Sequence, residues 1–173
     1  MQGLKFRKTN IIEILHDSLN KLSHPDTVTI ELKSTLHDEA VSIDHEQMVN
    51  VFSDLSRNAV EAMPDGGSLT IQVEGDEKQV TIEITDTGVG IAEENMPLLF
   101  TPFFTTKPVG DGTGLSLPQA YACVKGHHGD ISIESNADPK KGETGTTVKI
   151  TLPRSQAYQK ELSKIILHEE DEE

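Results

Sequence analysis

The sequence predicts an α+β fold: a two-layer α/β sandwich in which a mixed, mainly antiparallel sheet carries its helices on one face. Two observations predict it. Apolar residues recur every three or four positions in three segments, as in amphipathic helices, and alternate with polar residues in six others, as in half-buried strands. These segments follow one another as helix, strands, helix, hairpin, long loop, helix and hairpin.

The first helix is predicted to begin after Asn10, whose side chain can accept hydrogen bonds from the N–H groups of a first turn. Apolar residues follow at helical spacing until Pro25 ends the segment. Residues 27–33 alternate between apolar and polar as in a strand, and we expect a short strand at 40–43 to pair with them.

A long helix is predicted to begin at Asp44, which with Gln47 three positions later resembles a capping box. One face of this helix is apolar, and the turn at Pro64, Gly66 and Gly67 ends it. The apolar face comprises Met48, Val51, Phe52, Leu55, Ala59 and Ala62.

Strands at 68–74 and 79–85 alternate in hydropathy and are joined by a polar turn, so we predict a hairpin. From 86 to 113 the periodicity gives way to glycines and prolines, and a loop of that length in a small domain is usually functional or mobile. The remaining predicted elements are a helix at 113–125 and strands at 130–135 and 146–152.

The composition excludes several classes of protein. The 173 residues include 15 Lys or Arg and 29 Asp or Glu, for a net charge of −14. We therefore expect no nucleic-acid partner, because such proteins need a basic surface. A single cysteine, Cys123, excludes an internal disulfide and fits a reducing compartment. No apolar run approaches the ~20 residues that cross a bilayer, so we expect no membrane contact by this segment and a cytoplasmic location.

We divide the chain into three parts. Residues 1–9, with three basic residues and no acid, are interpreted as the remnant of an upstream linker, and residues 10–153 as the domain itself. Residues 154–173 carry an apolar helical stripe and end in an acidic tail. This last part fits a helix docked on the domain, a solvated linker to a further domain, or a dimerisation helix.

The first candidate motif is a pair of polar residues on the long helix. Asp54 and Asn58 are one turn apart and share a face at the rim of the apolar stripe. A carboxylate and a carboxamide supply oxygen ligands to a hard cation such as Mg²⁺, which takes few protein ligands and leaves positions for phosphate and water. The alternative is a polar helix edge that binds nothing.

The second motif, DTGVG, follows the strand at 79–85. Asp86 is an acceptor-only carboxylate that suits an exocyclic amine such as that of adenine. Gly88 and Gly90 allow a ligand to approach the backbone closely. An ordinary Asp-Gly turn is the alternative.

Two further motifs lie in and after the long loop. LFTPFFTTK places Phe100, Phe103 and Phe104 beside Lys107, a candidate phosphate contact. Apolar anchors in such a loop are typical of a mobile lid, and a loop pinned to the core also fits them. GDGTGLSLPQA runs from three glycines into a helix, whose first N–H groups can bind an anion, although the spacing is neither a Walker A loop nor a dinucleotide fingerprint. Thr146 offers a hydroxyl at the start of the last strand.

In this order the motifs resemble the N, G1, F, G2 and G3 boxes of the ATP-binding catalytic domain of sensor histidine kinases, in the superfamily shared with gyrase, a heat-shock chaperone and mismatch-repair ATPases. The resemblance covers about 10–153. Its most specific parts, RNAVEAMPDGG and PFFTTKPVGDGTGL, look most like kinases of the nitrogen-regulation type. It implies the Bergerat fold, with ATP between the helices and beneath a lid. We predict that this lid, at about 94–112, is poorly ordered without nucleotide.

The resemblance also implies roles for the motif residues. Asn58 would hold Mg²⁺ against the phosphates of ATP, and Asp86 would accept a hydrogen bond from the adenine amine. The glycine box before the third helix would offer backbone N–H groups to the phosphates. The implied nucleotide-binding set is Asn58, Asp86, Gly88, Gly90, Lys107, Gly112, Thr113, Gly114, Leu115 and Thr146.

The implied reaction transfers the γ-phosphoryl group of ATP to a histidine on a separate dimerisation and phosphoacceptor domain, absent from this chain, and then to an aspartate of a response regulator. The chain would then be the cytoplasmic part of a sensor, including a larger, membrane-anchored one. Two other functions stay open. One is a stand-alone ATPase of the gyrase or mismatch-repair type, and the other is an ATP-binding regulatory module without catalysis.

The chain departs from the family pattern at two positions. Asp54 stands where these kinases usually have Asn and hydrolytic relatives have Glu, and we hypothesise that it orients the attacking nucleophile or accepts its proton. Ser116 replaces a glycine, and we expect no loss of binding.

The net charge comes from residues 10–153, the body of the domain. The charges of residues 1–9 and 154–173 cancel, so the whole −14 belongs to this body. Such a body must bind a polyanion through Mg²⁺, helix N–H groups and a few cations such as Lys107 and Arg57.

Overall fold

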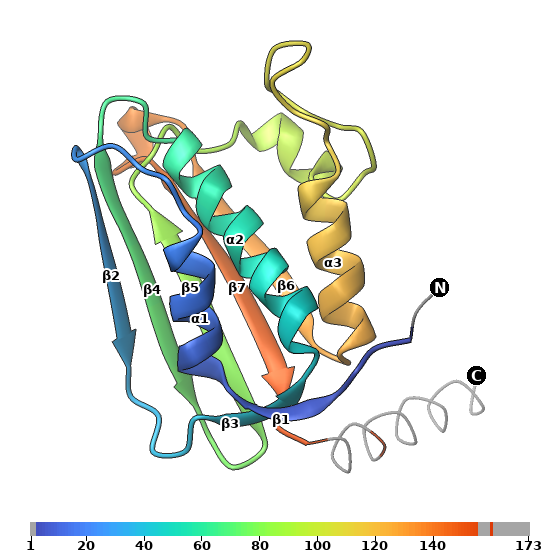
Figure 1. Cartoon of the computed structure of the whole chain (residues 1–173). Helices are drawn as coiled ribbons and strands as arrows, with labels where there is room; N and C mark the ends of the chain where they lie inside the picture. Colours follow the sequence, from blue (N-terminus) through green and yellow to red (C-terminus); the bar gives the residue numbers. More distant parts are fainter. Residues whose placement is uncertain (1–2, 156–159, 161–173) are drawn as a thin grey trace.

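The computed structural model describes residues 3–155 and 160, so all but a few residues of the predicted C-terminal helix and tail lie outside the described part. The fold has two layers: a five-stranded sheet and three helices on one of its faces (Figure 1). The predicted α+β sandwich is confirmed. Within the described residues, no helix combines the length and the apolar character needed to cross a membrane.

The helices and strands follow the predicted order, with one strand that the sequence did not predict at the N-terminal end. Most bounds lie within two residues of the prediction, and the third helix begins three residues later than predicted. The elements are β1 (Arg7–Asn10), α1 (Ile11–Asn20), β2 (Val28–Ser34), β3 (Ala40–Ile43), α2 (His45–Glu61), β4 (Gly67–Gly75), β5 (Gln79–Asp86), α3 (Ser116–Gly126), β6 (Asp130–Asn136) and β7 (Gly145–Pro153), with 3₁₀ turns at Glu93–Leu98 and Pro139–Lys141.

The strand order of the main sheet is β2-β4-β5-β7-β6. Only β2 and β4 pair in parallel in this sheet, and the other three pairs are antiparallel. Our expectation that β3 pairs with β2 is wrong. Parallel strands need a long connection between them, and here β3 and α2 form that connection from β2 to β4. β3 therefore leaves the main sheet and pairs with β1 instead.

Strand β1 lies across the boundary that we drew between an upstream linker and the domain. It pairs antiparallel with β3 from Arg7 opposite Ile43 to Asn10 opposite Ala40. Just before it, the backbone N–H of Lys5 donates to Asp44 Oδ2 at 2.8 Å. The ordered fold thus begins earlier in the chain than the hydrophobic pattern indicates.

The core lies between the helices and the sheet. The apolar face of α2 is buried there as predicted, except that Ala62 is only half-buried, and Phe52 and Met48 are fully buried. The predicted N-cap of α1 is confirmed, because Asn10 Oδ1 accepts hydrogen bonds from the N–H groups of Ile12 and Glu13 at 2.8 and 3.1 Å.

The predicted capping box of α2 is confirmed in one half. Asp44 Oδ1 accepts from the N–H of Gln47 at 3.2 Å, but the N–H of Asp44 donates to His127 Nε2 at 3.0 Å. His127 follows α3 and is fully buried. Because Nε2 accepts, the proton is on Nδ1, which donates to the carbonyl of Cys123 at 2.7 Å. One neutral imidazole ring therefore joins the end of α3 to the start of α2.

Burial lowers the pKa of His127, even though the carbonyl of Cys123 and the carboxylate of Asp44 act in the opposite direction. Burial also raises the pKa of the Cys123 thiol to about 11, so this cysteine is an unreactive, packed residue. Its Sγ lies 3.9 Å from Met48 Sδ. At this end of α2 and α3, the buried His127 ring thus provides a specific polar link beside the packed side chains of Cys123 and Met48.

Acidification is expected to destabilise the fold through His127. Its pKa is lowered in the folded state, so the unfolded chain takes up the proton first. The stabilisation is fully present above the ordinary histidine value of about 6.5 and is lost as the pH falls through the folded pKa. We expect His127→Gln to lower the free energy of unfolding at neutral pH by about 1–3 kcal/mol, the cost of unpaired buried groups. Its stability should then fall less steeply below pH 6.5 than that of the wild type.

Urea titrations at a series of pH values measure this difference. The exposed His16→Gln variant is the control and should keep the wild-type slope. Asp44 titrates in a separate window: burial acts to raise its pKa, but hydrogen bonds from the N–H groups of Lys5 and Gln47 lower it overall, below 3.8. Equal slopes for His127→Gln and the wild type near pH 6 would contradict the assignment.

Candidate functional site

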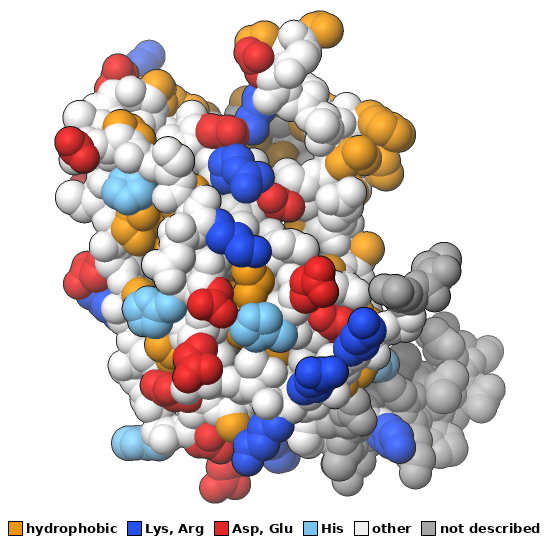
Figure 2. All heavy atoms as spheres, viewed as in Figure 1, with side chains coloured by type: hydrophobic (Ala, Val, Ile, Leu, Met, Phe, Trp, Pro, Cys, Tyr) orange, Lys and Arg blue, Asp and Glu red, His pale blue; other side chains and the backbone are white. Residues whose placement is uncertain are grey.

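A cavity of about 480 Å³ lies between α2, α3, the long loop and the ends of β5 and β7. This volume is in the range of small-molecule sites. In the space-filling view a hollow opens at the top of the helical face, below the protruding loop (Figure 2). Of the residues predicted for the site, those that line the cavity are Asn58, Asp86, Gly90, Lys107, Gly112, Thr113, Gly114 and Thr146.

Apolar side chains form a large part of the cavity wall. They come from both layers of the fold, so the wall forms only when the helices pack on the sheet. Such a wall with a carboxylate among its residues suits a flat heteroaromatic ring that bears an amine. The apolar lining residues are Leu55, Ala59, Ala62, Ile84, Val89, Ile91, Leu99, Phe104, Leu117, Pro118, Ile133 and Val148.

Asp86 is the last residue of β5 and is only 6% exposed. Its Oδ1 accepts from the N–H of Gly88 at 2.8 Å. Burial raises the pKa of Asp86, and hydrogen bonds from the backbone N–H groups of Gly88 and Thr146 partly oppose that effect. A buried acceptor of this kind is satisfied best by a donor from a ligand, since water has little access to it.

The two glycines of the DTGVG turn allow close packing behind the cavity. A Cβ on Gly88 would lie 2.3 Å from the carbonyl oxygen of Ala62, and a Cβ on Gly90 would lie 2.0 Å from that of Asn136. Gly90 also has a positive φ of 73°. Gly90 lines the cavity, whereas Gly88 lies outside the lining. Glycine is therefore required at both positions by close backbone contacts, at Gly88 with the end of α2 and at Gly90 with the end of β6.

Thr146 pairs with Asp86 across β5 and β7 and is held by Ser135, which is not among the predicted site residues. Its Oγ1 lies 2.7 Å from Ser135 Oγ, which also accepts from the N–H of Ile91 at 2.8 Å. Ser135 thereby ties the DTGVG loop to β6 and β7. No sequence signal marks Ser135, because it acts through contacts between distant segments.

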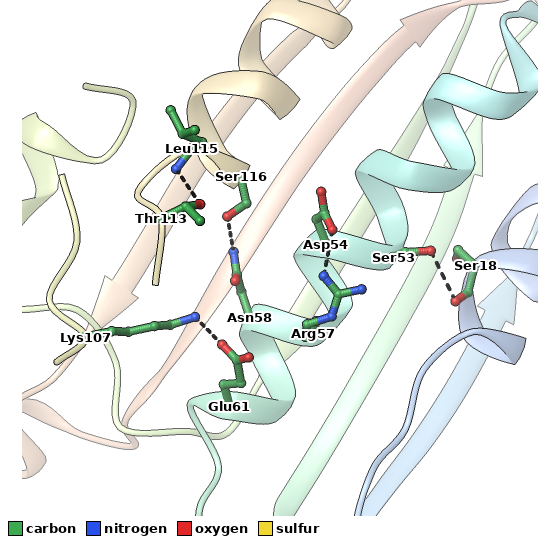
Figure 3. A network of polar contacts seen from close by, with 10 residues as sticks. All are labelled: Ser18, Ser53, Asp54, Arg57, Asn58, Glu61, Lys107, Thr113, Leu115 and Ser116. Carbon is green, nitrogen blue, oxygen red and sulfur yellow. Dashed lines mark hydrogen bonds and ion pairs between the residues drawn. The ribbon is translucent and has the colours of Figure 1, made fainter. Parts of the chain in front are cut away.

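Asn58 faces α3 across the cavity. Its Nδ2 donates to Ser116 Oγ at 3.2 Å (Figure 3). One turn further along α2, Glu61 forms an ion pair with Lys107 of the long loop. Glu61 is not among the predicted site residues, although its spacing of three from Asn58 on a helix puts it on the same face. The predicted phosphate contact Lys107 is therefore paired with a carboxylate in this structure.

Asp54 does not line the cavity with Asn58. Its Oδ1 accepts from Arg57 Nη1 at 2.8 Å, and Arg57 rather than Asp54 is in the lining (Figure 3). Asp54 would have to leave Arg57 to act on a nucleophile, and its proposed role stays a prediction.

The long loop is closed at its base by one backbone hydrogen bond, from the N–H of Phe103 to the carbonyl of Gly114 at 2.9 Å. Gly114 has a φ of 68°, and a Cβ there would lie 2.4 Å from the carbonyl carbon of Phe103. This left-handed turn is the reason why α3 begins at Ser116 and not at Thr113. Leu115 lies outside the lining, and its N–H is bonded by Thr113 Oγ1 at 3.3 Å.

The three phenylalanines of the loop, which we interpreted as anchors of a lid or of a pinned loop, lie in three different surroundings. Phe100 packs on Tyr121 with ring centroids 5.0 Å apart, and Phe104 lines the cavity. Phe103 is 74% exposed and has a positive φ of 68°. The loop is thus pinned before Phe103 and projects beyond it (Figure 1). The expected disorder of 94–112 without nucleotide stays a prediction.

The charged side chains of the cavity do not by themselves attract an anion. Its described lining has two basic side chains, Arg57 and Lys107, and three acidic ones, Glu61, Asp86 and Asp111. No group of three His, Cys, Asp or Glu residues within the described part could hold a metal ion by itself. The oxygens of Asn58 and Glu61 fit a cation such as Mg²⁺, which binds one or two protein ligands together with substrate phosphates.

A sequence profile described as "Histidine kinase-, DNA gyrase B-, and HSP90-like ATPase" matches residues 43–156. The chain belongs to this ATPase family. Two relatives of this ATPase domain are sporulation kinases of Bacillus subtilis (strain 168). Kinase E is 31% identical over 156 residues, which are 88% of this chain and 20% of that protein. Kinase A is 39% identical over 111 residues, which are 64% of this chain and 17% of that protein.

Solved structures support the same conclusion for the ATPase domain. The mycobacterial sensor histidine kinase MprB has a TM-score of 0.74 and 26% identity, over 86% of this chain and 97% of that one. The nucleotide-free catalytic domain of histidine kinase ThkA has a TM-score of 0.74 and 25% identity, over 89% and 99%. The predicted resemblance to the catalytic domain of sensor histidine kinases is confirmed, and the nitrogen-regulation type stays a prediction. The chain spans a fifth or less of the two sporulation kinases.

Asp86→Asn is expected to stabilise the nucleotide-free domain. Because the folded pKa of Asp86 is raised, its contribution to stability is fully present below the unfolded value of 3.8 and is lost as the pH rises through the folded pKa. Asparagine is neutral throughout, so the variant should unfold at a higher temperature at neutral pH. Thermal unfolding of the nucleotide-free protein, with the exposed Asp65→Asn as control, measures this. A lower unfolding temperature for Asp86→Asn would contradict it.

Proposed function

We propose that this domain binds Mg²⁺–ATP and donates the γ-phosphoryl group to a histidine on a separate dimerisation and phosphoacceptor domain. The observation that carries the proposal is the cavity that Asp86 and Asn58 line together, in an ATPase-family chain whose relatives are named sporulation kinases. The buried carboxylate suits the adenine amine, and the carboxamide suits a metal ion at the phosphates.

Different residues of this chain would bind the different parts of the nucleotide. Asp86 and Thr146 bind the adenine edge among the apolar side chains. Asn58 presents an oxygen to Mg²⁺, which neutralises phosphate charge when it is bound. The backbone at 112–114 lies along the cavity and offers N–H groups to the phosphates. Lys107 exchanges Glu61 for a phosphate oxygen, and this exchange costs little because half-exposed ion pairs contribute only about 0–1 kcal/mol.

In the transfer step the bond between the γ-phosphorus and its bridging oxygen breaks, a nitrogen–phosphorus bond forms at the acceptor imidazole, and ADP leaves. The chain contributes position and charge to this step, since phosphoryl transfer needs little covalent help from the protein. A response regulator then receives the phosphoryl group on an aspartate. A cytoplasmic location, alone or within a larger membrane-anchored sensor, completes the proposal.

Asn58→Ala tests the metal site. Removal of the carboxamide oxygen should abolish most of the gain in ATP-analogue affinity that Mg²⁺ confers, because Mg²⁺ takes only one or two protein ligands and Asn58 is the ligand proposed here. Isothermal titration with Mg²⁺ and with EDTA measures the gain, and Asn20→Ala, which lies at the exposed end of α1, is the control. If Asn58→Ala kept the full increase in ATP-analogue affinity on addition of Mg²⁺, the proposed role of Asn58 would be wrong.

Phosphotransfer is tested by adding a histidine-bearing dimerisation domain of a related kinase and [γ-³²P]ATP. Label on that domain supports the proposal. Steady release of phosphate by this chain alone would favour the stand-alone ATPase, and stabilisation by ATP with neither activity would favour a regulatory module.

Asp54→Asn tests whether Asp54 acts on the nucleophile. If it accepts a proton or orients the acceptor, the rate of phosphotransfer should fall by about 10²–10⁴-fold while ATP affinity stays unchanged. The matched control is Asp65→Asn, which makes the same change at an exposed carboxylate outside the cavity. Unchanged phosphotransfer and ATP turnover in Asp54→Asn would show that the hypothesis is wrong.

A further inference from the structure

Ser116 departs from the glycine of the family pattern, and the structure places its hydroxyl on the metal-site residue. Ser116 is the first residue of α3 and lines the cavity. Its Oγ accepts from Asn58 Nδ2 at 3.2 Å, across the space between α3 and α2 (Figure 3). The two residues are 58 positions apart, so only the tertiary fold brings them together.

Helix capping does not account for this serine. The N-cap position of α3 is Leu115, and it makes no side-chain cap hydrogen bond. The N–H of Leu115 is bonded by Thr113 Oγ1, which does not involve Ser116. Alanine or glycine would also fit the first turn of a helix. What a serine adds here is an acceptor for Asn58.

An asparagine side chain has two different ends, and only its oxygen can bind a hard cation. Rotation about the last side-chain bond by half a turn exchanges these ends, and this rotation is soft. On α2 itself, Asn58 has a carboxylate one turn away on each side, at Asp54 and at Glu61, and each could attract the amide nitrogen. Both are already paired, with Arg57 and Lys107.

We propose that Ser116 is a positioning residue that holds the Asn58 carboxamide by its nitrogen, so that the oxygen is turned to the Mg²⁺ of the bound nucleotide. This inference rests on the proposed function. When Lys107 leaves Glu61 for a phosphate, Glu61 becomes a competing acceptor for Asn58 Nδ2. The hydroxyl on α3 then keeps the carboxamide directed across the cavity and not along α2.

Ser116→Ala removes the acceptor and Ser116→Thr keeps it. The matched control is Ser53→Ala, since Ser53 is also a serine that bridges two helices: its Oγ donates to the carbonyl of Ser18 on α1 at 3.4 Å, away from the cavity (Figure 3). Isothermal titration of a non-hydrolysable ATP analogue is run on each variant with Mg²⁺ and with EDTA.

We expect Ser116→Ala to lose about three- to tenfold of the affinity gained from Mg²⁺, the fold-change that one neutral hydrogen bond represents. Its affinity in EDTA should stay at the wild-type value. Ser116→Thr and Ser53→Ala should both keep the wild-type gain. Equal losses with Mg²⁺ and with EDTA would overturn the proposal, because they would mean that Ser116 contacts the nucleotide or shapes the helix. An unchanged gain in Ser116→Ala would overturn it too.

A second readout uses the protein without nucleotide or metal. The ¹⁵N relaxation of the Asn58 side-chain NH₂ group reports its mobility on the ps–ns timescale. It should be ordered in the wild type, in Ser116→Thr and in Ser53→Ala, and more mobile in Ser116→Ala. Equal mobility in Ser116→Ala and the wild type would overturn the positioning role. If the wild type fails to bind Mg²⁺–ATP, the proposed function fails, whatever the NMR result shows of the hydrogen bond.

Discussion

Two hydrogen bonds tie α2 to α3 at opposite ends, and the geometry of the cavity between them depends on this link. At one end the backbone N–H of Asp44 donates to the buried His127, and at the other the side chain of Asn58 donates to Ser116. The 14 positions between Asp44 and Asn58 correspond to roughly 20 Å of helix at 1.5 Å per residue. The two bonds therefore lie at the two ends of an antiparallel helix pair that flanks the cavity.

In the proposed function, an acidic chain binds a polyanion. The cations of the cavity are held by carboxylates, Arg57 by Asp54 and Lys107 by Glu61, so the cavity has little free positive charge. Attraction for phosphates must then come from a metal ion, from backbone N–H groups and from the exchange of a weak ion pair. The charge of the body thus favours a metal-dependent nucleotide site over one based on basic side chains.

The loop over the cavity combines a fixed part with a part that projects from the domain. Phe100 and Leu99 pack against the body, whereas Phe103 is exposed beyond them. The hydrogen bond between Phe103 and Gly114 separates these parts and depends on two backbones with positive φ. Strain of this kind is commonly found at functional segments, because the surrounding structure must hold it in place. The base of the loop is therefore held by its backbone geometry, whereas its tip makes few contacts with the rest of the domain.

The sequence by itself determined the three helices, every strand of the described part except β1, the N-caps at Asn10 and Asp44, and eight of the residues that line the cavity. These depend on local spacing, on capping side chains and on motifs that lie within one stretch of chain. Only the tertiary structure decided which strand pairs with β3, that Asn58 meets Ser116, and that Asp54 is turned to Arg57. In each case the residue or strand has several possible partners, and the local sequence does not distinguish between them. The packing of the helices on the sheet decides which partners meet, and this packing depends on several segments at once, so no single segment predicts it.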